Sequence, residues 1–190
     1  MKQTASQKAK ANTSLNHIPA LFKKLDWSKV TVNLDWGGGK YVKGTEYLAE
    51  KDVENIVYDK YNQTAKKQKA ALDRAYHTQI DCITCSNVLN VIKSKAERTK
   101  LLKHIWLVIC CQSREFNNLP FIHFTMYEKN GDGKPDEDLP QTNMRTDKYL
   151  PEITANFPDS FEISMLNKVI SLQPITYSRY QDNQSIGARE

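Results

Sequence analysis

The sequence predicts an α+β protein in which a small, partly antiparallel sheet packs against a helical middle region. Residues 30–36 alternate apolar and polar side chains, which is typical of a half-buried strand with Thr31, Asn33 and Asp35 on its polar side. Apolar positions between residues 52 and 104 recur at a helical spacing. Runs with strand character return at residues 119–128 and 175–180.

A chain of 190 residues fits one domain, which we place at residues 15–181. Polar tails flank it at residues 1–14 and 182–190, and the first of these is expected to be flexible. No apolar run reaches the ~18 residues that a membrane-spanning helix needs. The first twenty residues contain no apolar block typical of a secretion signal, so we expect a cytoplasmic protein.

The remaining elements are assigned from apolar spacing and turn residues. Helices are expected at residues 15–25, 52–80 and 85–95, from residue 96 onward, and from residue 159 or 160 to residue 170. The apolar run Ile105–Cys111 fits a buried helix or a buried strand equally well, and residues 112–118 are expected to form a loop.

Three glycines, at positions 37–39, are expected to form a turn that leads into a partner strand at residues 40–43. A phosphate-binding loop of the Walker type is the alternative. That loop requires a glycine where this chain has Leu34, and a serine or threonine where it has Tyr41. The spacing therefore favours a turn.

Four cysteines are present, at positions 82, 85, 110 and 111. A structural zinc site needs four tetrahedral ligands, and two adjacent cysteines point in different directions. We therefore predict buried, reduced cysteines, and expect neither a metal nor a cofactor.

Positive charge is concentrated in the helical middle region, residues 52–104. Between Lys60 and Lys103 ten basic side chains face only three acidic ones, although the net charge of the whole chain is +5. Such a concentration suits the phosphates of a nucleic acid, whereas the alternative is a solvated helix surface. The residues predicted to contact nucleic acid are Lys66, Lys67, Lys69, Arg74, Lys93, Lys95, Arg98, Lys100 and Lys103.

An acidic segment, residues 128–138, is interpreted as an exposed hairpin turn. A calcium loop that starts at Glu128 would have suitable residues at Asn130, Asp132 and Gly133. Its twelfth position would be Leu139 instead of a bidentate glutamate. A metal-dependent nuclease is also disfavoured, because Pro135-Asp136 lies after the Asp-x-Lys triplet instead of before it.

The triplet His123-Phe124-Thr125 resembles one half of the signature of two-histidine phosphoesterases. The resemblance implies a pair of imidazoles, one acting as general base and one as general acid, with hydroxyl groups that hold the phosphate. A second such triplet is absent, because the other histidines, His17, His77 and His104, are followed by other residues.

Each catalytic constellation lacks an essential member, which favours a non-catalytic binding protein. We expect it to be nucleic-acid-associated or part of a nucleoprotein or viral-type assembly, with protein partners and no membrane. Two alternatives stay open. One is a structural or regulatory protein–protein interaction subunit without nucleic-acid contact, and the other is a phosphoesterase-like enzyme that uses His123 and Thr125.

Overall fold

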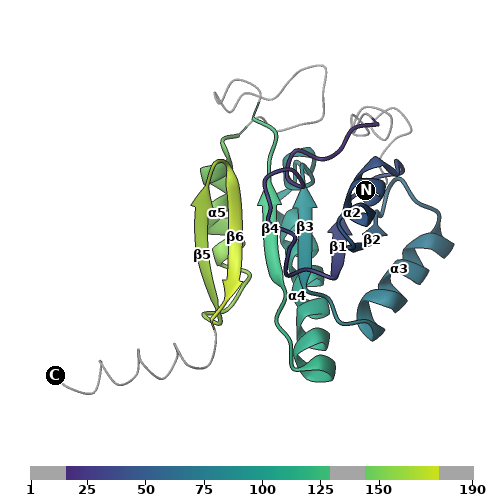
Figure 1. The fold of residues 1–190 in the computed structure, drawn as a ribbon. Coiled ribbons are helices and arrows are strands. Elements are labelled where there is room, and N and C mark those ends of the chain that lie inside the picture. The colour runs from purple at the N-terminus through teal and green to yellow at the C-terminus, as the bar shows by residue number, and fades with distance from the viewer. Residues whose placement is uncertain (1–15, 129–143, 176–190) are drawn as a thin grey trace.

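The computed structural model describes residues 16–128 and 144–175, which form a mixed sheet of six strands with helices on both faces (Figure 1). The strands are β1 (Val32–Trp36), β2 (Glu54–Tyr58), β3 (Cys82–Ser86), β4 (Phe121–Thr125), β5 (Phe161–Leu166) and β6 (Val169–Pro174). The helices are α2 (Lys43–Ala49), α3 (Ala65–His77), α4 (Lys95–Phe116) and α5 (Leu150–Thr154), with short 3-10 turns η1 (Leu89–Val91) and η2 (Thr146–Tyr149).

The sheet order is β2-β1-β3-β4-β6-β5. Strand β1 therefore lies between β2 and β3, the two strands that follow it in the chain. Strands β1 to β4 are parallel, whereas β5 and β6 form an antiparallel hairpin at one edge. Leu34 of β1 is in register with Ile56 on one side and with Ile83 on the other. The predicted α+β class with a partly antiparallel sheet is confirmed.

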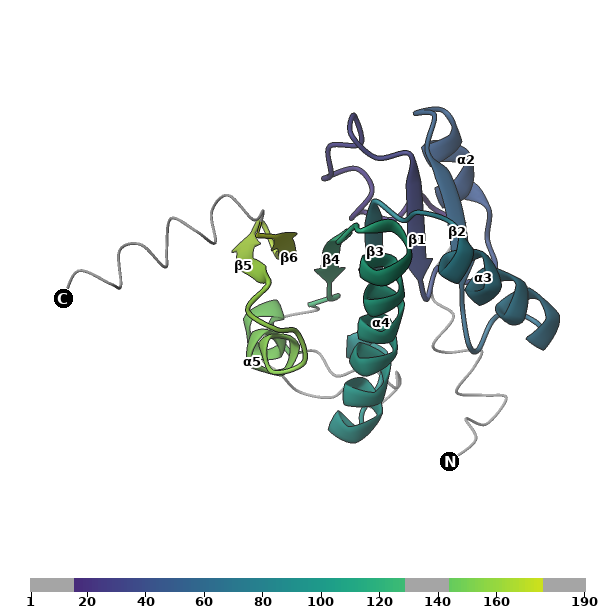
Figure 2. The ribbon, with the colours of Figure 1, turned by 90° about the horizontal axis from the view of Figure 1, so that it is seen from below.

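One face of the sheet carries the main hydrophobic core. Figure 2 shows α3, α4 and α5 on this side of the strands. Helix α4 contributes four side chains with no exposed surface, Leu102, Ile105, Val108 and Ile109. The strand side chains of this core include Leu34, Trp36, Ile56, Tyr58, Ile83, Ile122, Phe124, Ile170 and Leu172.

The opposite face is covered by α2 and by the segment before β1 (Figure 2). Leu21, Phe22 and Trp27 form a second cluster there with Leu48 of α2. The Trp27 indole donates a hydrogen bond to the Phe22 carbonyl at 2.7 Å, which satisfies its buried N–H group. The segment therefore closes this face although residues 16–25 form turns instead of the helix expected at residues 15–25.

Helix α4 extends further than the sequence predicted. Its Ser94 cap accepts a hydrogen bond from the Glu97 amide, and the left-handed Asn117 ends it. Ile105–Cys111 is therefore helical, and the loop expected at residues 112–118 is wrong as far as Phe116. The side chain of Gln112 is buried, accepts from the Ile80 amide at 2.7 Å and donates to the Ala75 and Thr78 carbonyls.

Three other expected helices are corrected. The helix at residues 52–80 is strand β2 followed by α3, and the helix at residues 85–95 is the end of β3 followed by η1. Parallel strands buried on both faces have no strict alternation of apolar and polar residues, so they can imitate a helical spacing. The helix expected up to residue 170 is the β5–β6 hairpin, whose turn residues Asn167 and Lys168 have φ of 51° and 64°.

Two expected strands also differ. Residues 40–42 are not a strand, because helix α2 begins at Lys43 shortly after the glycine turn. The strand expected at residues 175–180 lies outside the described residues except for Ile175. Within the described ranges, no helix is both long enough and apolar enough to cross a membrane.

Replacing Ile105 with alanine tests the position of α4 in the core. Ile105 has no exposed surface, so we expect Ile105→Ala to lower the free energy of unfolding by about 2–5 kcal/mol. Leu107, two residues further on the same helix, is 57% exposed, and Leu107→Ala should change stability by less than about 1 kcal/mol. Urea denaturation of both variants measures the difference. Equal losses would contradict the assigned helix orientation.

Candidate ligand site at the carboxyl ends of the parallel strands

The carboxyl ends of β1, β2 and β3 meet at one edge of the sheet. The chain leaves β1 toward α2 on one face and leaves β3 toward α4 on the other face (Figure 2). In doubly wound sheets, ligands bind where neighbouring connections diverge in this way, just beyond the strand ends. The polar residues at or just after these strand ends are Asp35, Asp59, Thr84, Ser86 and Asn87.

A glycine turn follows β1 directly. Gly37 and Gly39 have φ of 85° and 78°, a region that favours glycine. The Gly37 amide donates to the Tyr58 carbonyl at 2.6 Å, and the Gly39 amide donates to the Asp59 carboxylate at 2.9 Å. Two of the three glycine amides are therefore engaged within the protein, which agrees with a turn and not with a phosphate-binding loop.

Gly38 allows the turn to approach a carboxyl group closely. A β-carbon at this position would lie 2.2 Å from Asp35 Oδ2 and 2.9 Å from Val57 Cγ1. A β-carbon at Gly37 would lie 2.3 Å from Val88 Cγ2, so the connection after β3 forms the other wall. Glycine is thus required for steric reasons at both positions.

The Asp59 carboxylate holds the turn after β2 against the glycine turn. Its Oδ1 accepts from the amides of Tyr61 and Asn62 at 2.8 and 2.7 Å. Its Oδ2 accepts from the Gly39 amide at 2.9 Å and from Asn62 Nδ2 at 3.1 Å. Because a carboxylate has about four acceptor positions, Asp59 is saturated and acts as a structural group.

Asp35 is the buried acid of this site and is only 3% exposed. Its Oδ1 accepts from Thr84 Oγ1 at 3.2 Å. Burial raises the pKa of Asp35 to about 7, an effect that the Thr84 hydrogen bond opposes and the nearby Asp59 charge reinforces. The carboxyl group therefore gains or loses its proton near neutral pH, a property typical of functional sites.

A polar network surrounds Asp35 on the face covered by α2. Asn33 Nδ2 donates to Asn55 Oδ1 at 2.8 Å and to Thr84 Oγ1 at 3.0 Å. Asn55 Nδ2 donates in turn to Thr45 Oγ1 on α2 at 3.1 Å. The sequence predicted a solvent-facing polar side for this strand, so the burial of Asn33 and Asp35 is a correction.

An aromatic cluster lies behind the edge on the opposite face. The rings of Trp36 and Tyr58 are 4.6 Å apart, and His104 of α4 lies 4.9 Å from Trp36 in an edge-on arrangement. Burial and the nearby Lys60 charge lower the pKa of His104. His104 is therefore neutral at pH 7 and contributes aromatic contacts to the core.

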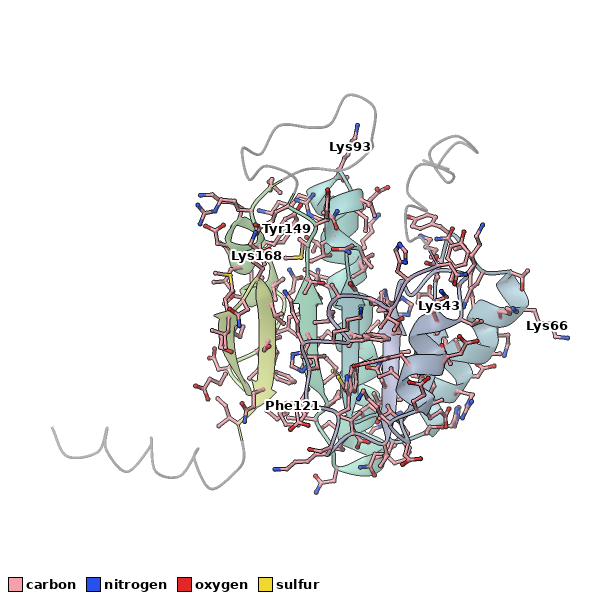
Figure 3. The ribbon with its side chains drawn as sticks, turned by 45° about the horizontal axis from the view of Figure 1, so that its top comes forward. Lys43, Lys66, Lys93, Phe121, Tyr149 and Lys168 are labelled. Atoms are coloured by element: carbon pink, nitrogen blue, oxygen red, sulfur yellow. The ribbon has the colours of Figure 1, made fainter. Side chains whose placement is uncertain are left out.

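The lysines predicted to contact nucleic acid are distributed over two helices and one connection. Helices α3 and α4 both begin beyond the carboxyl ends of their preceding strands, so their first turns flank the candidate site. In Figure 3, Lys66 and Lys93 project in different directions from this side of the molecule. Lys69 pairs with Asp73, and Arg74 pairs with Glu54. Lys66, Lys67, Lys93, Lys95, Lys100 and Lys103 are exposed.

Arg98 differs from the other predicted residues because its side chain is only 7% exposed. Its guanidinium pairs with Glu152 of α5 at 3.0 Å and donates to the carbonyls of Ile92 and Lys93 at 2.8 and 3.0 Å. Its guanidinium carbon also lies 5.6 Å from the centre of the buried Tyr149 ring. Arg98 therefore joins α4 to α5 and to the connection after β3.

The residues of the phosphoesterase alternative lie on β4. His123 Nδ1 is 2.9 Å from Ser171 Oγ, and burial lowers the pKa of His123 to about 4. Thr125 Oγ1 is 3.1 Å from Ser86 Oγ. Neither neighbouring strand, β3 nor β6, carries a histidine that could act as the second imidazole.

The acidic turn at residues 128–138 lies outside the described residues except for Glu128. Burial alone would raise the pKa of Glu128. Hydrogen bonds from Lys168 and Thr146 outweigh this effect and lower the pKa to about 2. The Lys168 ammonium is 2.7 Å from Glu128, which joins the end of β4 to the β5–β6 hairpin. Glu128 thus has a structural partner of its own.

No cluster of potential metal ligands is present in residues 16–128 and 144–175. No three histidine, cysteine, aspartate or glutamate residues there lie together in a way that could hold a metal ion. Burial raises the pKa of the Cys82 and Cys85 thiols, so both are protonated at neutral pH. The expected burial is correct for these two cysteines, whereas Cys110 is exposed.

Comparisons with known proteins give one structural likeness and no sequence match. No protein-family model and no curated protein matches the sequence. Among solved structures, the crystal structure of Streptomyces venezuelae DesVI resembles this chain with a TM-score of 0.50 and 8% sequence identity. The likeness covers 90% of this chain and 92% of that chain. At this identity it concerns the fold alone.

The raised pKa of Asp35 predicts a specific pH dependence of stability. Between the pKa of an unfolded aspartate, near 3.8, and about 7, the unfolded state loses its proton while the folded state keeps it. Folding therefore becomes less favourable as pH rises through this range. The stability of Asp35→Asn relative to the wild type should increase by up to about 4 kcal/mol between pH 4 and pH 8. Denaturant titrations across this range measure the change, and parallel pH profiles would contradict it.

Arg98→Leu should be strongly destabilising, because it leaves the Glu152 carboxylate buried without its cation. We expect a loss of about 3–5 kcal/mol in the free energy of unfolding. Lys100→Leu, on the exposed part of the same helix, should cost less than about 1 kcal/mol. Adding Glu152→Leu to Arg98→Leu should recover much of the loss, and a double variant as unstable as the single one would contradict a paired charge.

Proposed function

We propose that this protein binds a nucleoside cofactor of the S-adenosylmethionine type and acts as a methyltransferase. The observation that carries the proposal is the glycine turn after β1, which lies directly on a buried carboxyl group at the point where the connections after β1 and β3 diverge. Small ligands bind at this place in doubly wound sheets.

The chemistry of the turn favours a cationic ligand over a phosphorylated one. A pyrophosphate needs free backbone amides and a helix N-terminus directly behind the glycines. Here the amides of Gly37 and Gly39 are engaged, and α2 is a seven-residue helix that begins only at Lys43. Asp35 beneath Gly38 would repel a phosphate and attract an ammonium or sulfonium group.

S-adenosylmethionine fits these requirements, because it carries a sulfonium and an ammonium group but no phosphate. When bound, it supplies an electrophilic methyl group. Asp35 would attract its positive charge from beneath Gly38, and Val88 would form the wall beyond Gly37. This proposal departs from the expectation, drawn from the sequence, of a non-catalytic protein without a cofactor.

Isothermal titration of the purified chain with S-adenosylmethionine and S-adenosylhomocysteine tests the proposal. We expect binding of both, and at least tenfold weaker binding of NAD, which carries a pyrophosphate. Asp35→Asn should weaken the binding of S-adenosylmethionine by about tenfold, which corresponds to about 1.4 kcal/mol, because it removes the negative charge that attracts the sulfonium and ammonium groups.

Asp73→Asn is the matched control, because it removes an exposed carboxylate on α3 away from the site. It should leave the binding of S-adenosylmethionine unchanged. Absence of binding by the folded wild-type protein, or tighter binding of NAD, would refute the proposed cofactor.

A non-catalytic, nucleic-acid-associated protein is the second candidate function. The observation that favours it is the group of exposed lysines on the first turns of α3 and α4. This candidate predicts binding of nucleic acid without binding of S-adenosylmethionine.

A further inference from the structure

Two lysine–tyrosine pairs lie beside the candidate site. Lys40 and Tyr41 directly follow the glycine turn, and Lys60 and Tyr61 directly follow Asp59. The Lys40 ammonium lies 5.2 Å from the centre of the Tyr41 ring, and the Lys60 ammonium lies 5.7 Å from the centre of the Tyr61 ring. We call these four residues the lysine–tyrosine rim.

The two pairs are neighbours although twenty residues separate them in the sequence. The 2.9 Å hydrogen bond from the Gly39 amide to Asp59 Oδ2 joins the residues that immediately precede each pair. Asp59 also accepts from the Tyr61 amide, which holds the second pair to the same turn. The rim therefore lies along one side of the edge that contains Gly38 and Asp35.

The rim presents flat aromatic surface next to positive charge. Tyr41 is 38% exposed and Tyr61 is half-buried, while both lysines are exposed. Burial, together with the charges of Glu97 and Asp59, raises the pKa of Tyr61, so its ring is neutral at pH 7. An aromatic ring can stack on a nucleobase while the neighbouring ammonium contacts the phosphate, which is the combination used by proteins that bind single strands.

Other lysines extend the positive charge away from the rim. Lys43 begins α2, and Lys66 and Lys67 lie in the first turn of α3. In Figure 3, Lys43 and Lys66 lie on the same side of the molecule, with Lys66 projecting furthest outward. The one acid within the rim's two turns, Asp59, is 4% exposed and saturated, so the opposing charge near the rim comes mainly from the exposed Glu97 of α4.

We propose that the lysine–tyrosine rim binds single-stranded nucleic acid and presents one of its nucleotides to the candidate site as the methyl acceptor. In that transfer a nucleophilic atom of the nucleotide would form the new bond to the methyl carbon while the sulfonium–methyl bond breaks. S-adenosylhomocysteine would then leave, and the proton lost by the acceptor would pass to solvent. The inference names the substrate class of the proposed methyltransferase and therefore depends on that function for its catalytic part. A single strand is required because the faces of bases are accessible to tyrosine rings only when they are unstacked. The exposed lysines of the rim would contact the phosphates of the strand. Each contacted phosphate releases counterions, which makes the affinity depend on salt.

The test measures binding of fluorescently labelled twelve-nucleotide DNA and RNA strands to the full chain by anisotropy at several salt concentrations. With about four phosphates contacted, the slope of log affinity against log salt should be near −2.8 for a single strand. Tyr41→Leu and Tyr61→Leu should each weaken binding about tenfold, whereas Tyr41→Phe, which keeps the ring, should bind almost as the wild type does. The duplex of the same sequence should bind more weakly than the single strand.

The chain offers a matched control in a third lysine–tyrosine pair. Lys51 lies 5.0 Å from the centre of the Tyr47 ring, but this pair belongs to α2 and the residues just after it, before β2 begins. Tyr47→Leu and Lys51→Ala should leave nucleic-acid binding unchanged. If they weaken it as much as Tyr41→Leu does, or if no strand binds at low salt, the inference is wrong.

Titration with S-adenosylmethionine separates this inference from the proposed function. Rim variants that lose nucleic acid but retain the cofactor would support both. A wild-type chain that binds the cofactor but no nucleic acid would overturn the inference alone. A chain that binds nucleic acid through the rim but no cofactor would overturn the proposed function and leave the rim as a binding surface, and melting temperatures would verify that each variant is folded.

Discussion

The geometry of the candidate site depends on the Asp59 carboxylate, whose two oxygens accept four hydrogen bonds. These bonds join the turn after β2 to the glycine turn after β1, at the level where Trp36 and Tyr58 end their strands in register. A buried carboxylate is stable when its acceptor positions are filled. With this link in place, Gly38 lies on Asp35 and the lysine–tyrosine pairs lie side by side.

The two faces of the sheet have different roles. The face toward α3, α4 and α5 is apolar and carries most of the core, so it provides most of the stabilising burial. The other face holds the polar network of Asn33, Thr84 and Asp35 beneath α2. Burying such groups costs free energy even when they are hydrogen-bonded, and an acid with a raised pKa lowers stability further near neutral pH. Because groups with perturbed pKa values cluster at functional sites, this cost in stability fits a functional site better than a purely structural core.

Sequence patterns predicted a strand or helix correctly where the spacing of its apolar residues was enough to identify it. The alternation at residues 30–36 predicted β1, and the helical spacing after residue 96 predicted the first part of α4, up to about Ile105. The apolar spacing wrongly predicted a helix for β2. Ile56 and Tyr58 lie on the core face of this short strand, but Val57 between them is also apolar. The strand therefore lacks a clear alternation and continues the spacing of the helix that follows it. It also failed for the β5–β6 hairpin, whose turn uses Asn167 and Lys168 instead of the glycine that usually marks such a turn.

The sequence by itself determined the α+β class, the turn at the three glycines and the concentration of lysines around α3 and α4. Only the tertiary structure decided which of the polar residues act together. Asp35 meets Thr84 because β1 and β3 are paired, and Arg98 is buried because Glu152 lies opposite it, 54 residues further along the chain. Contacts of this kind join residues that are far apart in the sequence, and they form because the strands pair and the helices bury apolar surface. They leave no periodic pattern in the local sequence.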